Sequence, residues 1–356
     1  MAPHLILLGG FLGAGKTTLA LTSAQRLISR GFYVGLITND QGSELVDTAL
    51  LRQAPLAVAE VGGGCFCCRY PDLLKALDEM VCQVSPDVIF AEAVGSCTDI
   101  LSTVIRPLLA QRASTYHIAP LTVAYDPLRN IERFSGEVHY LFHQQLHEAE
   151  VLVLTKQDVP AAAKTRETFQ VLAERYGVDK IFPLSAVTGE GVDAWLDCVL
   201  TSTTGAAKRL DVDYATYAAG EAALGWLNAV GELTSNQKFS PCNWATHLLH
   251  MMDDALSAHN APIAHLKIYF RTENDESYKA SLIESGGSVR WDSKSTGQNA
   301  SRLTFVFNAR VQSSPVLLEN VVRHVFAELS PFPEFAYKFT RFECFHPSAP
   351  QPTHRM

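Results

Sequence analysis

The sequence predicts an α/β protein, in which a mostly parallel sheet covered by helices is followed by a smaller α+β domain. Over the first 200 residues, short continuous apolar runs alternate with amphipathic segments of helix length. Continuous apolar runs are typical of strands buried on both faces of a parallel sheet. After Leu200 the alternation stops and the patterns become those of an α+β layer. At roughly 100–200 residues per domain, the 356 residues are enough for two domains.

The first predicted domain covers residues 1–205. Its expected strands are Leu5–Leu8, Tyr33–Ile37, Val88–Phe90, Leu121–Ala124, Val151–Leu154 and Ile181–Leu184. Its expected helices are Thr17–Ser29, Leu73–Gln83, Tyr140–Glu150 and Lys164–Tyr176. Because each strand is followed by a helix-length segment, the strands are expected to lie parallel.

The second predicted domain covers residues 221–346, after a linker at 206–220 and before a tail at 347–356 that we expect to fray. Its expected strands are Ala222–Leu233, Ala264–Phe270, Tyr278–Ile283 and Leu303–Val311. Its expected helices are Trp244–Ala258 and Pro315–Leu329, and Ser285–Ser301 has the composition of a loop. The strands lack the spacing of a repeated strand–helix unit, which indicates a mixed layer.

Charge and hydropathy exclude several classes of protein. The net charge is −8, and residues 1–205 hold 15 basic against 22 acidic residues, so neither half has the basic excess of a nucleic-acid binder. The apolar segment Leu5–Gly15 is too short and too rich in glycine to span a bilayer, and no basic region precedes it as in a secretion signal. We therefore expect a cytoplasmic protein with no nucleic-acid or membrane partner.

The segment GFLGAGKT at residues 10–17 fits the phosphate-binding pattern G-x-x-x-x-G-K-[ST] at every fixed position. It follows a predicted strand and opens a predicted helix, where backbone N–H groups and the helix N-terminus bind phosphate. Lys16 is expected to bridge the β- and γ-phosphates, and the Thr17 hydroxyl is expected to ligate Mg²⁺. The nucleotide-binding residues expected in this segment are Gly10, Gly13, Ala14, Gly15, Lys16, Thr17 and Thr18.

A second segment indicates which base is bound. TKQD at residues 155–158 follows a predicted strand and resembles the guanine-recognition motif N-K-x-D, and LSAV at 184–187 resembles the loop that backs the base. Guanine presents two adjacent donors to one carboxylate, whereas adenine would leave that carboxylate unpaired. GTP is therefore predicted as the nucleotide. The residues expected at its base are Thr155, Lys156, Asp158, Ser185 and Ala186.

Two acidic residues follow strands that flank the phosphate segment. Glu92 stands at the end of the strand in PDVIFAEAVG, where a carboxylate orders a Mg²⁺-bound or attacking water. Asp40 follows the second strand and is placed to reach the metal ion across the phosphates. We predict Lys16, Glu92 and Asp40 as the catalytic residues.

Three of the eight cysteines fall within four residues, in the segment GCFCC at 64–68. Thiolates suit Zn²⁺, Cu⁺ or Fe, and also allow Co²⁺ or Ni²⁺, so Cys65, Cys67 and Cys68 are predicted to bind a transition metal. A fourth ligand must come from elsewhere or from water. The alternative is a redox-labile or merely buried cluster. The other cysteines, Cys97 among them, are expected mostly to be small buried apolar residues.

Together, residues 10–18, Gly64–Cys68, Glu92-x-x-Gly95 and TKQD at 155–158 resemble the CobW-like GTPases, relatives of the hydrogenase and urease nickel-insertion GTPases. The resemblance covers most of residues 1–200 and extends more loosely to the second domain, which would be the CobW C-terminal domain. It implies a P-loop fold and a metallochaperone that uses GTP to load a metal held by the C-x-C-C loop. Glu60 would be a neighbour of that metal.

These expectations define a GTP-hydrolysing protein that holds Zn²⁺ or Co²⁺ and delivers it to a client metalloprotein. The sequence allows a homodimer. The alternative from another class is a non-catalytic metal or redox sensor that binds GTP as a regulatory ligand. An ATP-dependent small-molecule kinase is disfavoured by Asp158, because adenine offers it no pair of donors.

Overall fold

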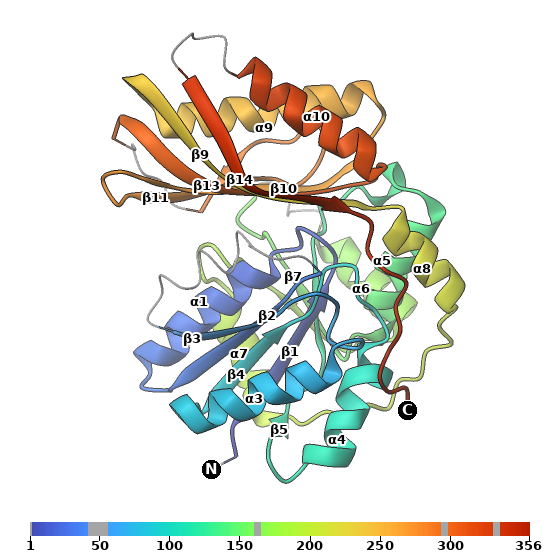
Figure 1. The fold of residues 1–356 in the computed structure, drawn as a ribbon. Helices are drawn as coiled ribbons and strands as arrows, with labels where there is room; N and C mark the ends of the chain where they lie inside the picture. The colour runs from blue at the N-terminus through green and yellow to red at the C-terminus, as the bar shows by residue number, and fades with distance from the viewer. Residues whose placement is uncertain (1, 42–55, 160–164, 293–297, 330–334) are drawn as a thin grey trace.

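The computed structural model describes residues 2–41, 56–159, 165–292, 298–329 and 335–356. The molecule contains two sheets, one in each half of the chain (Figure 1). The N-terminal sheet has helices on both faces, and the C-terminal sheet lies over one end of that domain with two helices on its far side. The predicted α/β class with a smaller α+β layer is confirmed.

The N-terminal sheet is parallel throughout. Its strands are β1 (His4–Gly10), β2 (Val34–Asn39), β3 (Ala57–Val61), β4 (Val88–Glu92), β5 (His117–Ile118), β6 (Thr122–Tyr125), β7 (Val151–Leu154) and β8 (Lys180–Pro183). The order is β3-β2-β4-β1-β6-β7-β8, with β5 paired to β1. The carboxyl ends of β1, β2 and β4 therefore lie side by side at the edge that faces the second sheet (Figure 1). This is the edge at which ligands bind in open parallel sheets.

Helices cover both faces of this sheet. They are α1 (Lys16–Ser29), α3 (Tyr70–Val84), α4 (Arg106–Arg112), α5 (Gly136–Glu148), α6 (Thr165–Tyr176) and α7 (Val192–Thr201). One turn of π-helix, Leu101–Ile105, leads into α4, and a 3₁₀ turn spans Ile131–Arg133. None of the helices in the described ranges is long and apolar enough to cross a bilayer.

The C-terminal sheet is antiparallel, in the order β12-β11-β10-β13-β9-β14. Its strands are β9 (Gly225–Phe239), β10 (Ile263–Thr272), β11 (Ser277–Leu282), β12 (Arg290–Trp291), β13 (Ala300–Val311) and β14 (Phe335–Phe345). Helices α9 (Pro241–Ala258) and α10 (Pro315–Glu328) pack on one face. Along β10, apolar Leu266, Ile268 and Phe270 join the core shared with these helices. His265 and Lys267 alternate with them, so they lie on the face toward the N-terminal domain.

Two predictions about the connecting segments differ from the structure. Helix α8 (Tyr214–Ala222) begins in the expected linker 206–220 and runs two residues beyond it. The helix is capped by the Asp213 side chain, which accepts a hydrogen bond from Ala215 N at 3.0 Å. The tail 347–356 runs back along the N-terminal domain instead of fraying (Figure 1). Its Arg355 Nε lies 2.8 Å from Oδ2 of the buried Asp99, and Met356 N donates to Ser102 O at 2.9 Å. The domain boundaries themselves stay a prediction.

Candidate functional site

The phosphate-binding segment joins β1 to α1 as the sequence predicts. Gly10, Gly13 and Gly15 have φ angles of 124°, 76° and 94°. Residues other than glycine rarely adopt such positive φ angles. At Gly10 a Cβ atom would also lie 2.3 Å from the carbonyl oxygen of Ala124. Lys16 is buried, and its amine donates to Gly10 O at 2.7 Å. The Lys16 amine, which is expected to bind the nucleotide's phosphates, thus contacts a backbone carbonyl of its own loop.

The predicted Mg²⁺ ligand and the predicted acid are in contact. Thr17 Oγ1 donates to Oε1 of Glu92 at 2.8 Å, from the first turn of α1 to the end of β4. Hydroxyl and carboxylate oxygens are the hard donors that Mg²⁺ takes. The pair therefore fits a Mg²⁺ ion beside the phosphates, and Thr18 lines the same pocket.

The base end of the pocket brings together the two segments predicted to read the base. Ser185 Oγ donates to Oδ1 of Asp158 at 2.7 Å, so the two loops hold one carboxylate in place. Thr155 Oγ1 donates to Ala14 O at 2.8 Å and so ties this end to the phosphate loop. Ala186 lines the pocket beside Asp158.

Lys156 connects the two ends of the pocket. Its Nζ donates to Gly13 O at 2.9 Å and pairs with the buried carboxylate of Asp126. Burial lowers the pKa of Lys156 to about 8, although the Asp126 charge opposes that shift. The Lys156 side chain thus reaches from the Asp158 end of the pocket to the phosphate loop.

Asp40 lies at the carboxyl end of β2 and makes a contact that the sequence does not predict. Its two oxygens accept from the guanidinium of Arg310 at 3.1 and 3.3 Å. Arg310 lies on β13 of the C-terminal domain, is 1% exposed and stacks 4.0 Å from the centroid of the Trp226 ring. Asp40 also lines a hollow with Lys16 and Glu92. It is therefore adjacent to the phosphate site while its charge is paired across the domain interface.

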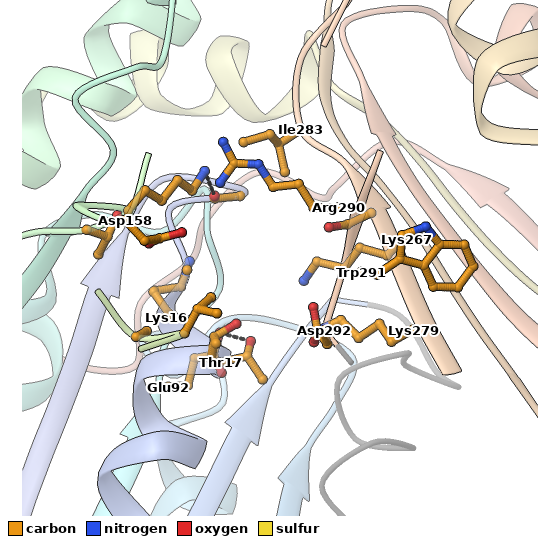
Figure 2. Close-up of a pocket in the computed structure, with 18 residues that line it drawn as sticks. Lys16, Thr17, Glu92, Asp158, Lys267, Lys279, Ile283, Arg290, Trp291 and Asp292 are labelled. Carbon is orange, nitrogen blue, oxygen red and sulfur yellow. Dashed lines mark hydrogen bonds and ion pairs between the residues drawn. The ribbon is translucent and has the colours of Figure 1, made fainter. Parts of the chain in front are cut away.

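The C-terminal sheet supplies one wall of the nucleotide pocket (Figure 2). Lys267 on β10, Lys279 on β11 and Arg290 on β12 line it opposite the phosphate loop. Lys279 pairs with Asp292 at 2.8 Å. These cationic residues were not among the predicted site residues. Lys267 and Lys279 could have been found from the alternation of charged and apolar residues along β10 and β11. This alternation places the two lysines on the face away from α9 and α10.

The predicted metal-binding cysteines converge on one point. The sulfur atoms of Cys65, Cys67 and Cys68 lie within 4.8 Å of one another. A fourth thiol joins them: Cys97 Sγ lies 3.9 Å from Cys67 Sγ. Cys97 is buried in the hydrophobic core, as expected for most of the scattered cysteines, and its sulfur also faces this cluster. Glu60 is not among the side chains that converge here; it lines a separate hollow beside His346.

The four thiols share hydrogen bonds that move their pKa values apart. A hydrogen bond with Cys65 raises the pKa of Cys68 to about 11. Hydrogen bonds from Cys65 and Cys67 lower the pKa of Cys97 to about 6. Such a group of soft donors can bind a thiophilic metal once its protons leave.

The thiol loop is attached to the carboxyl end of β2. Asn39 Nδ2 donates to Val61 O at 2.8 Å and to Gly64 O at 2.7 Å, and its Oδ1 accepts from Phe66 N at 2.8 Å. Asn39 directly precedes Asp40. Asn39 therefore fixes the backbone around the cysteines, and its neighbour Asp40 lines the phosphate site.

The tail covers the outer side of the cysteines. Gln351 N donates to Cys68 Sγ at 3.1 Å, and Thr353 N donates to Cys67 O at 2.9 Å. A hollow beside Cys65 and Cys68 is lined by Glu221 and the tail. Cys65 and Cys68 therefore border a hollow at the protein surface.

Comparison with known proteins places these features in context. Residues 4–180 match the family model of the CobW/HypB/UreG nucleotide-binding domain. The chain is 28% identical over 167 residues to the zinc chaperone YjiA of Escherichia coli (strain K12), a match that covers 44% of this chain and 50% of that protein. It is 28% identical over 230 residues to the zinc chaperone CobW of Pseudomonas aeruginosa, covering 52% and 60%.

The chain thus spans about half the length of the curated relatives it matches. Among solved structures, the Zn(II)-bound YjiA GTPase from E. coli is similar with a TM-score of 0.37 and 16% identity. That match covers 92% of this chain and 99% of the YjiA chain.

Proposed function

We propose that this chain, whose N-terminal domain belongs to the CobW/HypB/UreG nucleotide-binding family, is a GTP-hydrolysing metallochaperone. In this proposal Cys65, Cys67 and Cys68 hold a transition metal, and the nucleotide controls its release to a client metalloprotein. The observation that carries the proposal is the direct attachment of the two sites: Asn39 fixes the thiol loop and Asp40 lines the phosphate site.

The pocket's own groups support GTP as the nucleotide. Asp158, held by Ser185, offers one carboxylate to the two donors of guanine. On binding, Lys16 exchanges the carbonyl of Gly10 for phosphate oxygens, and the phosphate loop supplies backbone N–H groups. Thr17 and Glu92 would hold Mg²⁺, which neutralises charge on the phosphates when bound. Glu92 also stands where it can orient the attacking water.

The cargo is proposed to be Zn²⁺, with Co²⁺ as the second candidate. Thiolates bind both ions, and Zn²⁺ in thiolate sites is almost always four-coordinate and tetrahedral. Zinc is also the metal in the names of the relatives YjiA and CobW. The cationic residues of the C-terminal sheet that line the pocket would contact the triphosphate.

The second candidate is a sensor that binds GTP and metal without turnover. The observation that favours it is the close approach of Cys65 Sγ and Cys68 Sγ, at 3.4 Å. A two-electron oxidant such as a peroxide could join two thiols at this separation in a disulfide, with the peroxide reduced to water, and this would displace the metal.

Hydrolysis by the purified protein separates the two. The metallochaperone predicts release of phosphate from GTP that changes when Zn²⁺ is bound. Lys16→Ala should abolish this release, because charge neutralisation and positioning supply most of phosphoryl-transfer catalysis. Lys180→Ala, an exposed lysine of the same domain, is the matched control. If the unchanged protein binds GTP tightly but does not hydrolyse it, the sensor is favoured instead. If Lys16→Ala hydrolyses GTP at the wild-type rate, residues 10–17 are not the phosphate-binding loop.

A further inference from the structure

We propose that Cys97 is the fourth ligand of the metal, so that Cys65, Cys67, Cys68 and Cys97 form a tetrathiolate site. The inference rests on the proposed function only in requiring that a metal binds the thiol cluster. It adds a ligand from outside the C-x-C-C loop, and that ligand follows the strand that ends at Glu92.

Three of the six separations between the sulfur atoms are close to those of a tetrahedral site. Zn–S bonds of about 2.3 Å place the sulfurs of a tetrahedron about 3.8 Å apart. The separations are 3.4 Å for Cys65–Cys68, 3.7 Å for Cys67–Cys68 and 3.9 Å for Cys67–Cys97. The group of sulfurs that all lie within 4.8 Å of one another contains Cys65, Cys67 and Cys68 but not Cys97. Closing the four sulfurs on one ion therefore requires the Cys97 sulfur to move toward the other three.

Cys97 is wholly buried in the hydrophobic core, and its two chain neighbours make polar contacts. Thr98 N donates to the hydroxyl of Tyr217 at 3.2 Å, and Ser96 Oγ donates to the buried carboxylate of Glu221 at 2.7 Å. An apolar cysteine packed for its volume needs none of these groups beside it. A ligand thiol does, because such groups fix the backbone on either side of it and hold its orientation.

The position of Cys97 in the chain gives this ligand a function that the other three lack. It follows Gly95 by two residues, and Gly95 packs so closely on the phosphate loop that a Cβ atom there would lie 3.0 Å from Leu12 Cα. Gln145 Nε2 donates to both Gly95 O and Cys97 O at 2.9 Å. The segment from Glu92 to Cys97 therefore connects the phosphate site to the metal without an intervening element.

A shift of this segment when the γ-phosphate leaves would move one sulfur of four. The site would change from a closed tetrathiolate to an open three-thiolate site with a free coordination position. Closed sites retain zinc, and sites with an open position exchange their ligands. Withdrawal of Cys97 is thus the step by which hydrolysis releases the metal.

X-ray absorption on the zinc-loaded protein counts the ligands directly. With a non-hydrolysable GTP analogue and Mg²⁺, under anaerobic conditions, we expect four sulfurs on Zn²⁺. Cys97→Ser should give three sulfurs and one oxygen, while the exposed Cys82→Ser should leave four. Co²⁺ in place of Zn²⁺ gives a second readout, since the thiolate-to-cobalt absorption should fall by about a quarter in Cys97→Ser only.

Three sulfurs in the unchanged protein, or four in Cys97→Ser, would overturn the inference and leave the proposed function intact. The count in the unchanged protein decides the matter even if Cys97→Ser does not fold. Failure of the unchanged protein to bind Zn²⁺ or Co²⁺ at all would overturn the proposed function as well.

Discussion

Asp158 is the residue whose chemistry selects the base. Asp158→Asn should weaken GTP binding by about 1–3 kcal/mol, because it removes one partner of charge-assisted hydrogen bonds. Binding of ATP should change little. Titration of fluorescent GTP and ATP analogues checks this, with the exposed Asp179→Asn as control. Equal losses for both nucleotides would mean that Asp158 does not contact the base.

Glu148 is a second residue with a measurable signature. It is fully buried on α5, where Thr98 Oγ1 donates to it at 3.2 Å, and burial raises its pKa to about 8. In the unfolded chain the pKa of a glutamate is about 4.3. Between these values the folded protein binds one more proton than the unfolded chain, so the free energy of unfolding should fall as pH rises.

Urea unfolding at a series of pH values between 5 and 8.5 measures this slope. Glu148→Gln keeps the shape of the protonated side chain and should flatten the slope. Part of it should remain, because burial also raises the pKa of Glu221 to about 7. An unchanged slope in Glu148→Gln would show that Glu148 does not titrate in this range.

At the scale of the element, β10 brings the second domain to the nucleotide. Lys267→Ala should weaken GTP binding by about 1.5–3 kcal/mol, the range for hydrogen bonds to charged groups. Lys238→Ala removes an exposed lysine from β9 of the same sheet and should have no effect. Binding of a GTP analogue to both variants is the measurement. Equal affinity of the Lys267 and Lys238 variants would place Lys267 outside the phosphate contacts.

The elements also show what the sequence could predict. The strands at 5–8, 88–90 and 151–154 were predicted because they are buried on both faces and read as continuous apolar runs. Strand β14 was missed: none of its side chains is fully buried, and polar residues interrupt the apolar ones, so Phe335–Phe345 show no continuous apolar run. The predicted start of β9 at Ala222 belongs to α8 instead, since an alanine-rich segment suits either a helix or a strand.

Within the candidate site, local patterns were predictable and long-range contacts were not. The residues of GFLGAGKT lie where the motif places them because strand, loop and helix are contiguous. Cys97 is 29 residues from Cys68, and only the pairing of β4 between β1 and β2 brings it there. Arg310 reaches Asp40 from 270 residues away, through a domain interface that no spacing in the sequence encodes.

At the scale of the whole molecule, buried arginines join the two domains. Arg129 Nη2 donates to Leu12 O in the phosphate loop at 2.6 Å and to Ala264 O of β10 at 2.9 Å. Arg310 pairs with Asp40 beside the thiol loop. The phosphate loop, the thiol loop and the C-terminal sheet are therefore in one connected network, and a change at the nucleotide is expected to reach all three.

The account's central claim is that nucleotide and metal binding are coupled, and two metal titrations test it most directly. Zn²⁺ is titrated into the protein saturated with a non-hydrolysable GTP analogue and, separately, with GDP, each with Mg²⁺. The account predicts tighter Zn²⁺ binding with the analogue, by the same factor by which Zn²⁺ tightens binding of the analogue relative to GDP, since linkage is reciprocal. Identical zinc affinities in the two nucleotide states would contradict it and leave a metal site that the nucleotide does not control.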